Sequence, residues 1–198
     1  MRVIAGEAKG RPLQAVPGKG TRPTTDKVKE AIFSMIGPYF NGGLALDLFA
    51  GTGGLGIEAL SRGFERAIFV DRDPRSVAVI HDNVRRTGMH ARAEVYRNDA
   101  GRALKALEKR RAALNLVLLD PPYAVRDADA LMVEMDDRGL LAPAALVVVE
   151  HAADVRYAER FGSFTTVNEA NYGEITVTVY RYEPGAKAPE GAENDATI

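Results

Sequence analysis

The residues best suited to chemistry are aspartates that follow apolar segments, together with one glycine-rich stretch. Asp71, Asp99 and Asp120 each end or directly follow such a segment, and residues 44–56 read LALDLFAGTGGLG. Carboxylates accept hydrogen bonds from polar ligands, and glycines let a ligand approach the backbone without a Cβ in the way. Each aspartate could instead be a helix cap or a turn former. Their repeated placement nevertheless predicts one shared ligand site.

The glycine-rich stretch resembles a nucleotide-binding loop. Gly51, Gly53 and Gly56 fit the pattern G-x-G-x-x-G, and Asp71 lies at the expected distance downstream to bind ribose hydroxyls. This pattern alone does not separate NAD from other adenosine ligands. Asp47 argues against NAD, because it lies inside the apolar segment that precedes the loop. A carboxylate there is costly unless it is paired, and it could face a cationic group such as an amino-acid ammonium.

A second argument against NAD is the sequence Asp120-Pro121-Pro122-Tyr123 at the end of an apolar segment. Two prolines remove two N–H donors, so the carbonyl groups there stay available as acceptors. Asp120 adds a carboxylate, and the ring of Tyr123 can stack on a base, a contact worth about 1–3 kcal/mol. Acceptors beside an aromatic ring suit a planar exocyclic amine. The alternative is a rigid turn with a packed tyrosine.

Strand-like and helix-like segments alternate along the chain and must position these residues. We predict strands at 44–49, 66–70, 93–97, 114–120 and 145–150, with helices after the glycine loop and near 74–87, 101–111 and 127–138. Such alternation predicts a parallel sheet whose strands all have their carboxyl ends at one edge. Strands at 163–169 and 174–182 share a short turn, which requires antiparallel pairing. The expected fold is a Rossmann-like, doubly wound α/β sheet of seven strands, mostly parallel with a C-terminal antiparallel hairpin.

The N-terminal residues predict an extension to this domain. Residues 2–16 resemble a β-hairpin, with strands RVIA and PLQAV, and a helix capped by Thr24 or Thr25 follows a loop. Residues 1–30 carry seven basic side chains and three acidic ones, although the whole chain has a net charge of only −1. A local basic face can bind phosphate when the overall charge is near zero, and a solvated arm is the alternative.

Composition limits the remaining possibilities. The 198 residues are 46% hydrophobic, which suits one domain with a substantial core. There is no cysteine, so disulfides and thiolate metal sites are excluded, and the three histidines lack metal-ligand spacing. No apolar run has membrane-spanning length and no signal peptide is evident, so we expect a cytoplasmic protein without a membrane or metal partner. We expect an extension at 1–23, a domain at 24–182 and a disordered tail at 183–198.

Several stretches resemble a known family. LDLFAGTGGLGIEALSRG and LDPPY are similar to the cofactor and catalytic motifs of class I S-adenosylmethionine-dependent amino-methyltransferases. RVIAGEAKGRPL, RPTTDKVKEAIFSMI and NYGEITVTVY resemble the bacterial 16S ribosomal RNA guanine-N2 methyltransferases of the RsmD family. The resemblance covers residues 2–182. One departure is Asp71, where relatives often carry glutamate, and both are acids that bind ribose.

The resemblance implies methyl transfer from S-adenosyl-L-methionine to guanine N2 in 16S rRNA, within a small-subunit ribosomal particle. It implies that Asp71 binds the ribose and Asp99 the adenine amino group, within a cofactor site of Asp47, Phe49, Gly51, Gly53, Asp71, Asn98, Asp99 and Asp120. The implied catalytic residues, which hold the guanine, are Asp120, Pro121 and Tyr123. The implied RNA-binding residues are Arg2, Lys9, Arg11, Arg22, Thr24 and Thr25.

Three other functions stay open from the sequence. An adenine-N6 methyltransferase is the nearest, because adenine also offers an exocyclic amine. A non-catalytic RNA-binding assembly protein with a vestigial fold is the second, although the intact Asp47, Gly51, Asp120 and Tyr123 argue against it. An NAD-dependent oxidoreductase is the third, and it lacks an obvious acid or base for hydride transfer.

Overall fold

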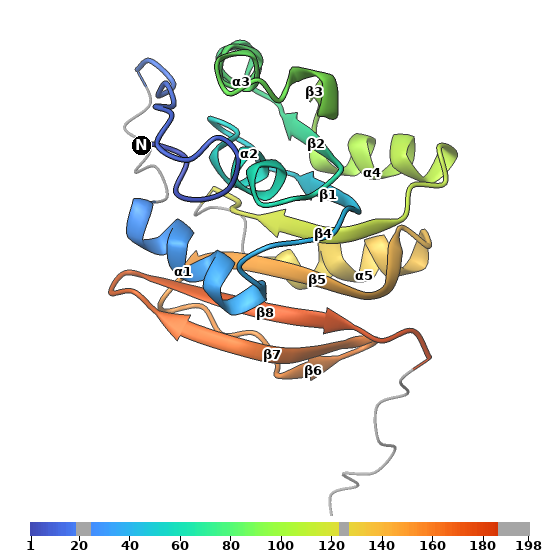
Figure 1. Ribbon diagram of the computed structural model, residues 1–198. Coiled ribbons are helices and arrows are strands. Elements are labelled where there is room, and N and C mark those ends of the chain that lie inside the picture. The colour runs from blue at the N-terminus through green and yellow to red at the C-terminus, as the bar shows by residue number, and fades with distance from the viewer. Residues whose placement is uncertain (19–24, 123–126, 186–198) are drawn as a thin grey trace, which may run out of the picture.

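One mixed sheet forms the centre of the computed structural model, which describes residues 1–18, 25–122 and 127–185 (Figure 1). The strand order is β3-β2-β1-β4-β5-β8-β7-β6. The strands are β1 Leu44–Asp47, β2 Arg66–Asp71, β3 Ala93–Arg97, β4 Leu114–Leu119, β5 Leu141–Ala152, β6 Arg160–Phe161, β7 Phe164–Asn171 and β8 Ile175–Tyr182. The helices are α1 Asp26–Ile36, α2 Gly54–Ser61, α3 Pro74–Arg86, α4 Ala100–Lys109 and α5 Ala128–Asp137, with a short 3-10 turn at His90–Arg92.

The pairing of the strands confirms the predicted fold class. β1 to β5 pair in parallel, and β8 joins β5 and β7 in antiparallel fashion. In the described part of the chain the sheet has eight strands where seven were expected, because Arg160 and Phe161 pair with Thr165 and Phe164 across a tight turn. A two-residue strand is too short to show an alternating pattern, so the sequence does not reveal it.

The predicted N-terminal hairpin forms only in part. A single antiparallel bridge joins Arg2 and Pro12, and the strands RVIA and PLQAV do not continue into a ladder. Three backbone hydrogen bonds join residues 1–3 to residues 10–13, and beyond them the N–H groups of Ile4 and Ala5 donate to the carboxylate of Glu58 on α2. A backbone donor satisfied by a helix side chain is not available to a neighbouring strand.

Helices cover both faces of the sheet, with α1, α2 and α3 on one side and α4 and α5 on the other (Figure 1). Successive residues of the central strands alternate between the two cores. Leu116 and Leu118 of β4 belong to the first core, and Val117 and Leu119 belong to the second. Burial on both faces explains why β4 has the continuous apolar sequence LNLVLL except at Asn115, near its start.

Glu58 of α2 joins the N-terminal segment to the domain. Its side chain is fully buried, and it forms ion pairs with Arg62 at 2.8 Å and with Lys29 of α1 at 3.5 Å. The same carboxylate accepts the N–H groups of Ile4 at 2.8 Å and Ala5 at 3.0 Å. Burial lowers the pKa of Lys29, and the negative charge of Glu58 acts in the opposite direction. The network therefore depends on this one carboxylate.

Replacing Glu58 should therefore destabilise the whole fold. Glu58→Ala leaves the charges of Lys29 and Arg62 buried without their partner, and breaking a buried pair in this way costs about 3–5 kcal/mol. The measurement is urea unfolding followed by circular dichroism. The control is Glu30→Ala on the exposed face of α1, which should change the free energy of unfolding by less than about 0.5 kcal/mol. Equal stabilities of the two variants would show that the network contributes little.

Candidate active site

The glycine loop leaves β1 and begins α2 at the carboxyl edge of the sheet. Gly51 and Gly53 have φ values of 54° and 77°, a left-handed conformation that side chains disfavour. At Gly56 an added Cβ would lie 2.3 Å from the ring of Phe69. Two glycines therefore serve the turn, and the third lets α2 pack closely on β2, as expected for a nucleotide-binding loop.

Asp47, at the end of β1, is a buried carboxylate beside this loop. Its side chain is 2% exposed and accepts the N–H of Gly56 at 2.9 Å. Burial raises the pKa of Asp47 to about 7, the hydrogen bond from Gly56 lowers it, and the negative charges of Asp120 and Asp71 raise it. A cationic group bound here would favour the ionised carboxylate. The predicted need of Asp47 for a partner is therefore met only in part by the protein.

Asp71, the last residue of β2, shapes the loop from the other side. One carboxylate oxygen accepts the N–H of Gly51 at 2.9 Å, and the other accepts the N–H of Asp73 at 2.8 Å. Asn98 follows β3 and donates its backbone N–H to the carbonyl of Asp71 at 3.1 Å. A carboxylate has about four acceptor positions, so these bonds leave capacity for ribose hydroxyls.

Asp120 and Pro121 follow β4, which pairs with β1, and both are partly buried. The charge of Asp120 acts on Asp47, which places the two carboxylates near each other. Phe49, just after β1, is partly buried against the core beneath α4 and α5. The structure thus places Asp47, Asp71 and Asp120 near one another at this edge of the sheet, and the ligand site that Asp71, Asp99 and Asp120 were expected to share stays a prediction.

Asp99 is more exposed than these residues. It is the N-cap of α4, where its side chain accepts the N–H of Arg102 at 2.9 Å. It also forms an ion pair with the guanidinium of Arg102 at 3.3 Å, and its side chain is 53% exposed. The helix-cap role that was the alternative for Asp99 is therefore present, and its contact with adenine stays a prediction.

The predicted RNA-binding residues of the N-terminal segment lie on the surface. Arg2 pairs with Asp26 at 3.2 Å, and Lys9 is exposed. The guanidinium of Arg11 donates to the backbone carbonyl of Arg86, the last residue of α3, at 3.0 Å. These positions are accessible to a large ligand, and their contact with RNA stays a prediction.

Four predicted site residues remain. Thr25 is the cap of α1, where its hydroxyl accepts the N–H of Val28 at 3.3 Å. Arg22, Thr24 and Tyr123 lie outside the described residues. Their roles in binding RNA and stacking on the base therefore stay predictions.

Asn83 of α3 is a structural residue that the sequence analysis missed. Its buried side chain donates to the carbonyl of Thr52 in the glycine loop at 2.9 Å and to the carbonyl of Gln14 at 3.1 Å. It also accepts the N–H of Gln14 at 2.8 Å. The sequence does contain a signal for this role, since Asn83 lies in the apolar stripe of an amphipathic helix. An amide at such a position is buried, and buried polar groups need hydrogen-bond partners. Asn83 links the glycine loop to the N-terminal segment.

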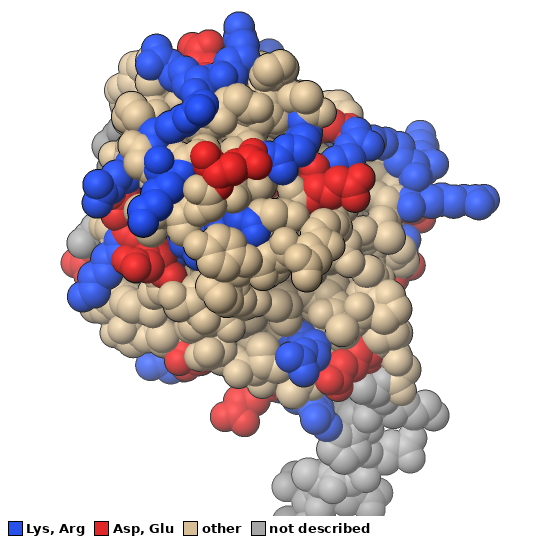
Figure 2. Space-filling model, viewed as in Figure 1, with Lys and Arg blue, Asp and Glu red and all other residues tan. Residues whose placement is uncertain are grey.

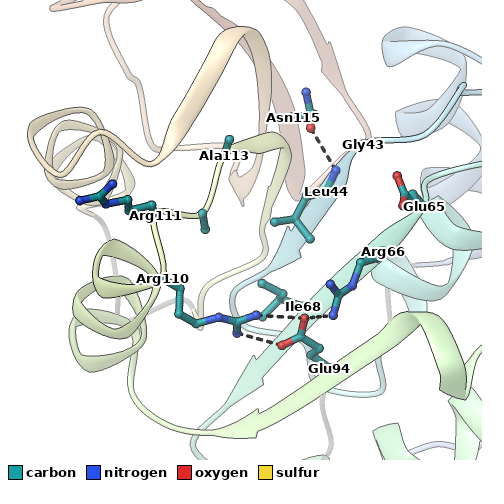
Figure 3. Close-up of a pocket in the computed structure, with 11 residues that line it drawn as sticks. Gly43, Leu44, Glu65, Arg66, Ile68, Glu94, Arg110, Arg111, Ala113 and Asn115 are labelled. Atoms are coloured by element: carbon teal, nitrogen blue, oxygen red, sulfur yellow. Dashed lines mark hydrogen bonds and ion pairs between the residues drawn. The ribbon is translucent and has the colours of Figure 1, made fainter.

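A cavity of about 410 Å³ lies at the opposite edge of the sheet, near the amino ends of β1, β2 and β4 (Figure 3). Arg66 and Arg110 line it, and both pair with Glu94, at 2.6 Å and 2.8 Å. The lining residues include none of the predicted catalytic or cofactor residues that the structure describes. The candidate active site at the carboxyl edge is therefore separate from this cavity.

Residues 1–18, 25–122 and 127–185 contain neither a cluster of metal ligands nor a membrane-spanning helix. Within these ranges no three histidine, aspartate or glutamate side chains are arranged to hold a metal ion. The helices of the same ranges are all too short or too polar to cross a bilayer. His151 is buried, and its Nε2 lies 2.9 Å from the hydroxyl of Thr178, which suits a structural role.

Comparison with known proteins identifies the family. The profile of the family described as "Conserved hypothetical protein 95" matches residues 1–181. The chain belongs to this family. The protein "Putative rRNA methyltransferase YlbH" of Bacillus subtilis is 50% identical over 181 residues, which are 91% of this chain and 98% of that protein.

Two further relatives match nearly the whole of this chain. "Ribosomal RNA small subunit methyltransferase D" of Haemophilus influenzae is 34% identical over 91% of this chain and 93% of that protein. The solved structure "Putative methyltransferase yhhF" from Escherichia coli is 31% identical, has a TM-score of 0.77, and is matched over 92% of this chain and 98% of that one. The resemblance to the RsmD family and the Rossmann-like fold are confirmed.

The buried carboxylate of Asp47 should make stability depend on pH. Its pKa is about 7 in the folded state and ordinary, near 3.8, in the unfolded chain. Between these two pKa values the folded state binds more protons than the unfolded state does. The contribution of Asp47 to the free energy of unfolding therefore falls as pH rises, and it is constant above about pH 7. Between about pH 5 and about pH 8, the free energy of unfolding of Asp47→Asn should therefore rise by roughly 2–3 kcal/mol relative to that of wild type.

The measurement is urea unfolding of both proteins across this pH range. The difference between the two curves reports the ionisation of Asp47 together with its interaction with Asp71 and Asp120. A difference that stays constant with pH would show that Asp47 is ionised throughout and that its burial is compensated.

Proposed function

We propose that this protein methylates the exocyclic N2 amine of a guanine in 16S ribosomal RNA, with S-adenosyl-L-methionine as the methyl donor. The observation that carries the proposal is the convergence of Asp47, Asp71 and Asp120 around the loop of Gly51 and Gly53. Family membership supports it, because relatives are named rRNA methyltransferases. The guanine N2 target rests on the resemblance described above.

The residues at this edge suit the parts of the proposed cofactor. The buried carboxylate of Asp47 suits a cationic amino-acid end, and the left-handed glycines allow close approach to the backbone. Asp71, at the end of the neighbouring strand, is placed to accept from ribose hydroxyls. When bound, S-adenosyl-L-methionine supplies a methyl group on a sulfonium, which is already electrophilic.

The contribution of the chain is to hold the amine in line. Asp120 and the carbonyl of Pro121 offer two acceptors at the end of β4, and the two prolines have no N–H to compete for them. The two N–H bonds of an exocyclic amine can then point toward these oxygens, which directs the nitrogen lone pair away from them. Both hydrogen bonds strengthen as the nitrogen gains positive charge, so they favour the transition state over the bound substrate.

The proposed organisation follows from this chemistry. Residues 24–182 form the catalytic domain, and residues 1–23 extend its surface for contact with rRNA, with the polar tail 183–198 outside both roles. The target base has to leave any stack to reach the acceptors. An rRNA substrate in a small-subunit particle implies action in the cytoplasm.

The direct test is methylation of unmodified 16S rRNA or small-subunit particles with S-adenosyl-L-methionine, followed by nucleoside mass spectrometry. We expect N2-methylguanosine. N6-methyladenosine in its place would move the target to adenine and contradict the proposal. If the protein binds both the RNA and the cofactor but leaves the RNA unmethylated, the result would support a non-catalytic assembly role.

Asp120→Asn should separate chemistry from binding. The variant keeps the shape of the side chain and removes the charge, so methyl transfer in a single turnover should fall by about 10²–10³. Affinity for S-adenosyl-L-methionine, measured by calorimetry, should stay within a few-fold of wild type. The matched control is Asp137→Asn at the exposed end of α5, which should react at the wild-type rate. A rate for Asp120→Asn within a few-fold of wild type would make Asp120 a turn former only.

A further inference from the structure

A strip of basic side chains runs along α3 and the N-terminal segment beside it. Residues 8–18 and 74–86 together carry five lysine and arginine residues against one acid, Asp82. Figure 2 shows Lys and Arg side chains gathered over this upper part of the molecule. We call this set the α3 strip, and all its members are exposed: Lys9, Arg11, Arg75, Arg85 and Arg86.

Specific contacts hold the two halves of the α3 strip together. Arg11 donates to the carbonyl of Arg86 at the end of α3, and Gln14 exchanges two hydrogen bonds with Asn83 one turn earlier. A Cβ at Gly18 would lie 3.7 Å from the guanidinium of Arg75, at the start of the helix. The N-terminal segment therefore runs antiparallel to α3 along its length, and the basic side chains have a fixed support.

The α3 strip begins at the active site. The N-cap of α3 is Asp73, two residues after Asp71 and bonded to its carboxylate. A helix of 13 residues is about 20 Å long, so the strip leads from the carboxyl edge of the sheet to a point about 20 Å away.

The acids near the α3 strip do not neutralise it. Arg75 pairs with Asp73 at 3.1 Å and Arg85 with Asp82 at 3.5 Å, but these arginines are 59% and 65% exposed. The pair of Arg85 with Asp82 is exposed on both sides and contributes at most about 1 kcal/mol, so Arg85 can exchange its carboxylate for a phosphate. Asp73 is only 14% exposed and holds Arg75 through two hydrogen bonds, so Arg75 keeps this carboxylate and offers its remaining donors to a phosphate. Arginine also matches phosphate oxygens with two parallel donors.

We propose that the α3 strip binds the phosphodiester backbone of the rRNA strand that carries the target nucleotide, and leads that strand to the acceptors of Asp120 and Pro121. This inference rests on the proposed function, and it adds Arg75, Arg85 and Arg86 to the RNA contacts expected from the N-terminal segment. Phosphate contacts fix the position of a nucleic acid without reading its sequence. The strip therefore sets the register of the strand, and the active site selects the base.

The test compares two double variants with equal charge loss. Arg85→Ala with Arg86→Ala removes the far end of the α3 strip and keeps the backbone carbonyl that Arg11 contacts. Lys105→Ala with Lys109→Ala removes two exposed charges from α4, on the other face of the sheet. Alanine favours helices, so both variants should fold. The probes are a 16S rRNA transcript and assembled small-subunit particles, with affinity for each measured against salt concentration.

We expect the α3 double variant to bind the transcript about tenfold more weakly at about 0.1 M salt, with the slope of log K against log salt reduced by about 0.7 for each lost phosphate contact. The α4 control should bind as wild type does. Affinity for S-adenosyl-L-methionine should be unchanged in both, because neither pair of substituted residues belongs to the proposed cofactor site.

Three outcomes would overturn the inference. Equal affinities and salt slopes for the two double variants would show that the α3 strip is a solvated face. A loss seen only with assembled small-subunit particles, and not with the transcript, would assign the strip to a protein partner. A wild-type protein that binds S-adenosyl-L-methionine but no RNA would contradict the proposed function as well, which distinguishes that failure from failure of the strip alone.

Discussion

The buried carboxylate of Glu58 is the interaction on which the arrangement of the molecule depends. It lies on α2, the helix that the glycine loop begins, and it is satisfied by Lys29, Arg62 and two backbone N–H groups. A buried ion pair adds little to stability over well-packed apolar residues, but losing one partner is costly. The main effect of the network is therefore to fix the position of the N-terminal segment, and its net contribution to stability is smaller. The network attaches that segment to α2, the helix that follows the glycine loop.

The two surfaces assigned to cofactor and RNA consequently share their supports. Asn83 bonds to Thr52 in the glycine loop and to Gln14 in the N-terminal segment, so it connects the same two regions from α3. The α3 strip then continues this connection along the surface, from the end of β2 outward. Catalysis by positioning requires that donor and acceptor be held in a fixed relation, and a common rigid support provides this.

Three carboxylates at one edge of the sheet carry an energetic cost when no ligand is bound. Burial raises the pKa of Asp47 to about 7, and the charges of Asp120 and Asp71 raise it as well. Asp71 offsets part of its own cost with N–H groups from Gly51 and Asp73. A site that is unfavourable for negative charge until a cation arrives is suited to a ligand with a cationic end, and strain of this kind is expected where function and stability compete.

The sequence by itself determined the fold class and the edge at which the chemistry is placed. Local rules of periodicity and turn geometry, which need no knowledge of distant contacts, account for the run LNLVLL, the loop of Gly51 and Gly53, and the aspartates that end β1 and β2 or follow β4. Only the tertiary structure decided the rest. Beyond the partly formed hairpin of residues 2–16, Ile4 bonds to Glu58, 54 residues away, and Asn83 acquired its role through Gln14, 69 residues away. Buried polar groups take whichever partner packing brings within reach, and one-dimensional patterns do not contain that information.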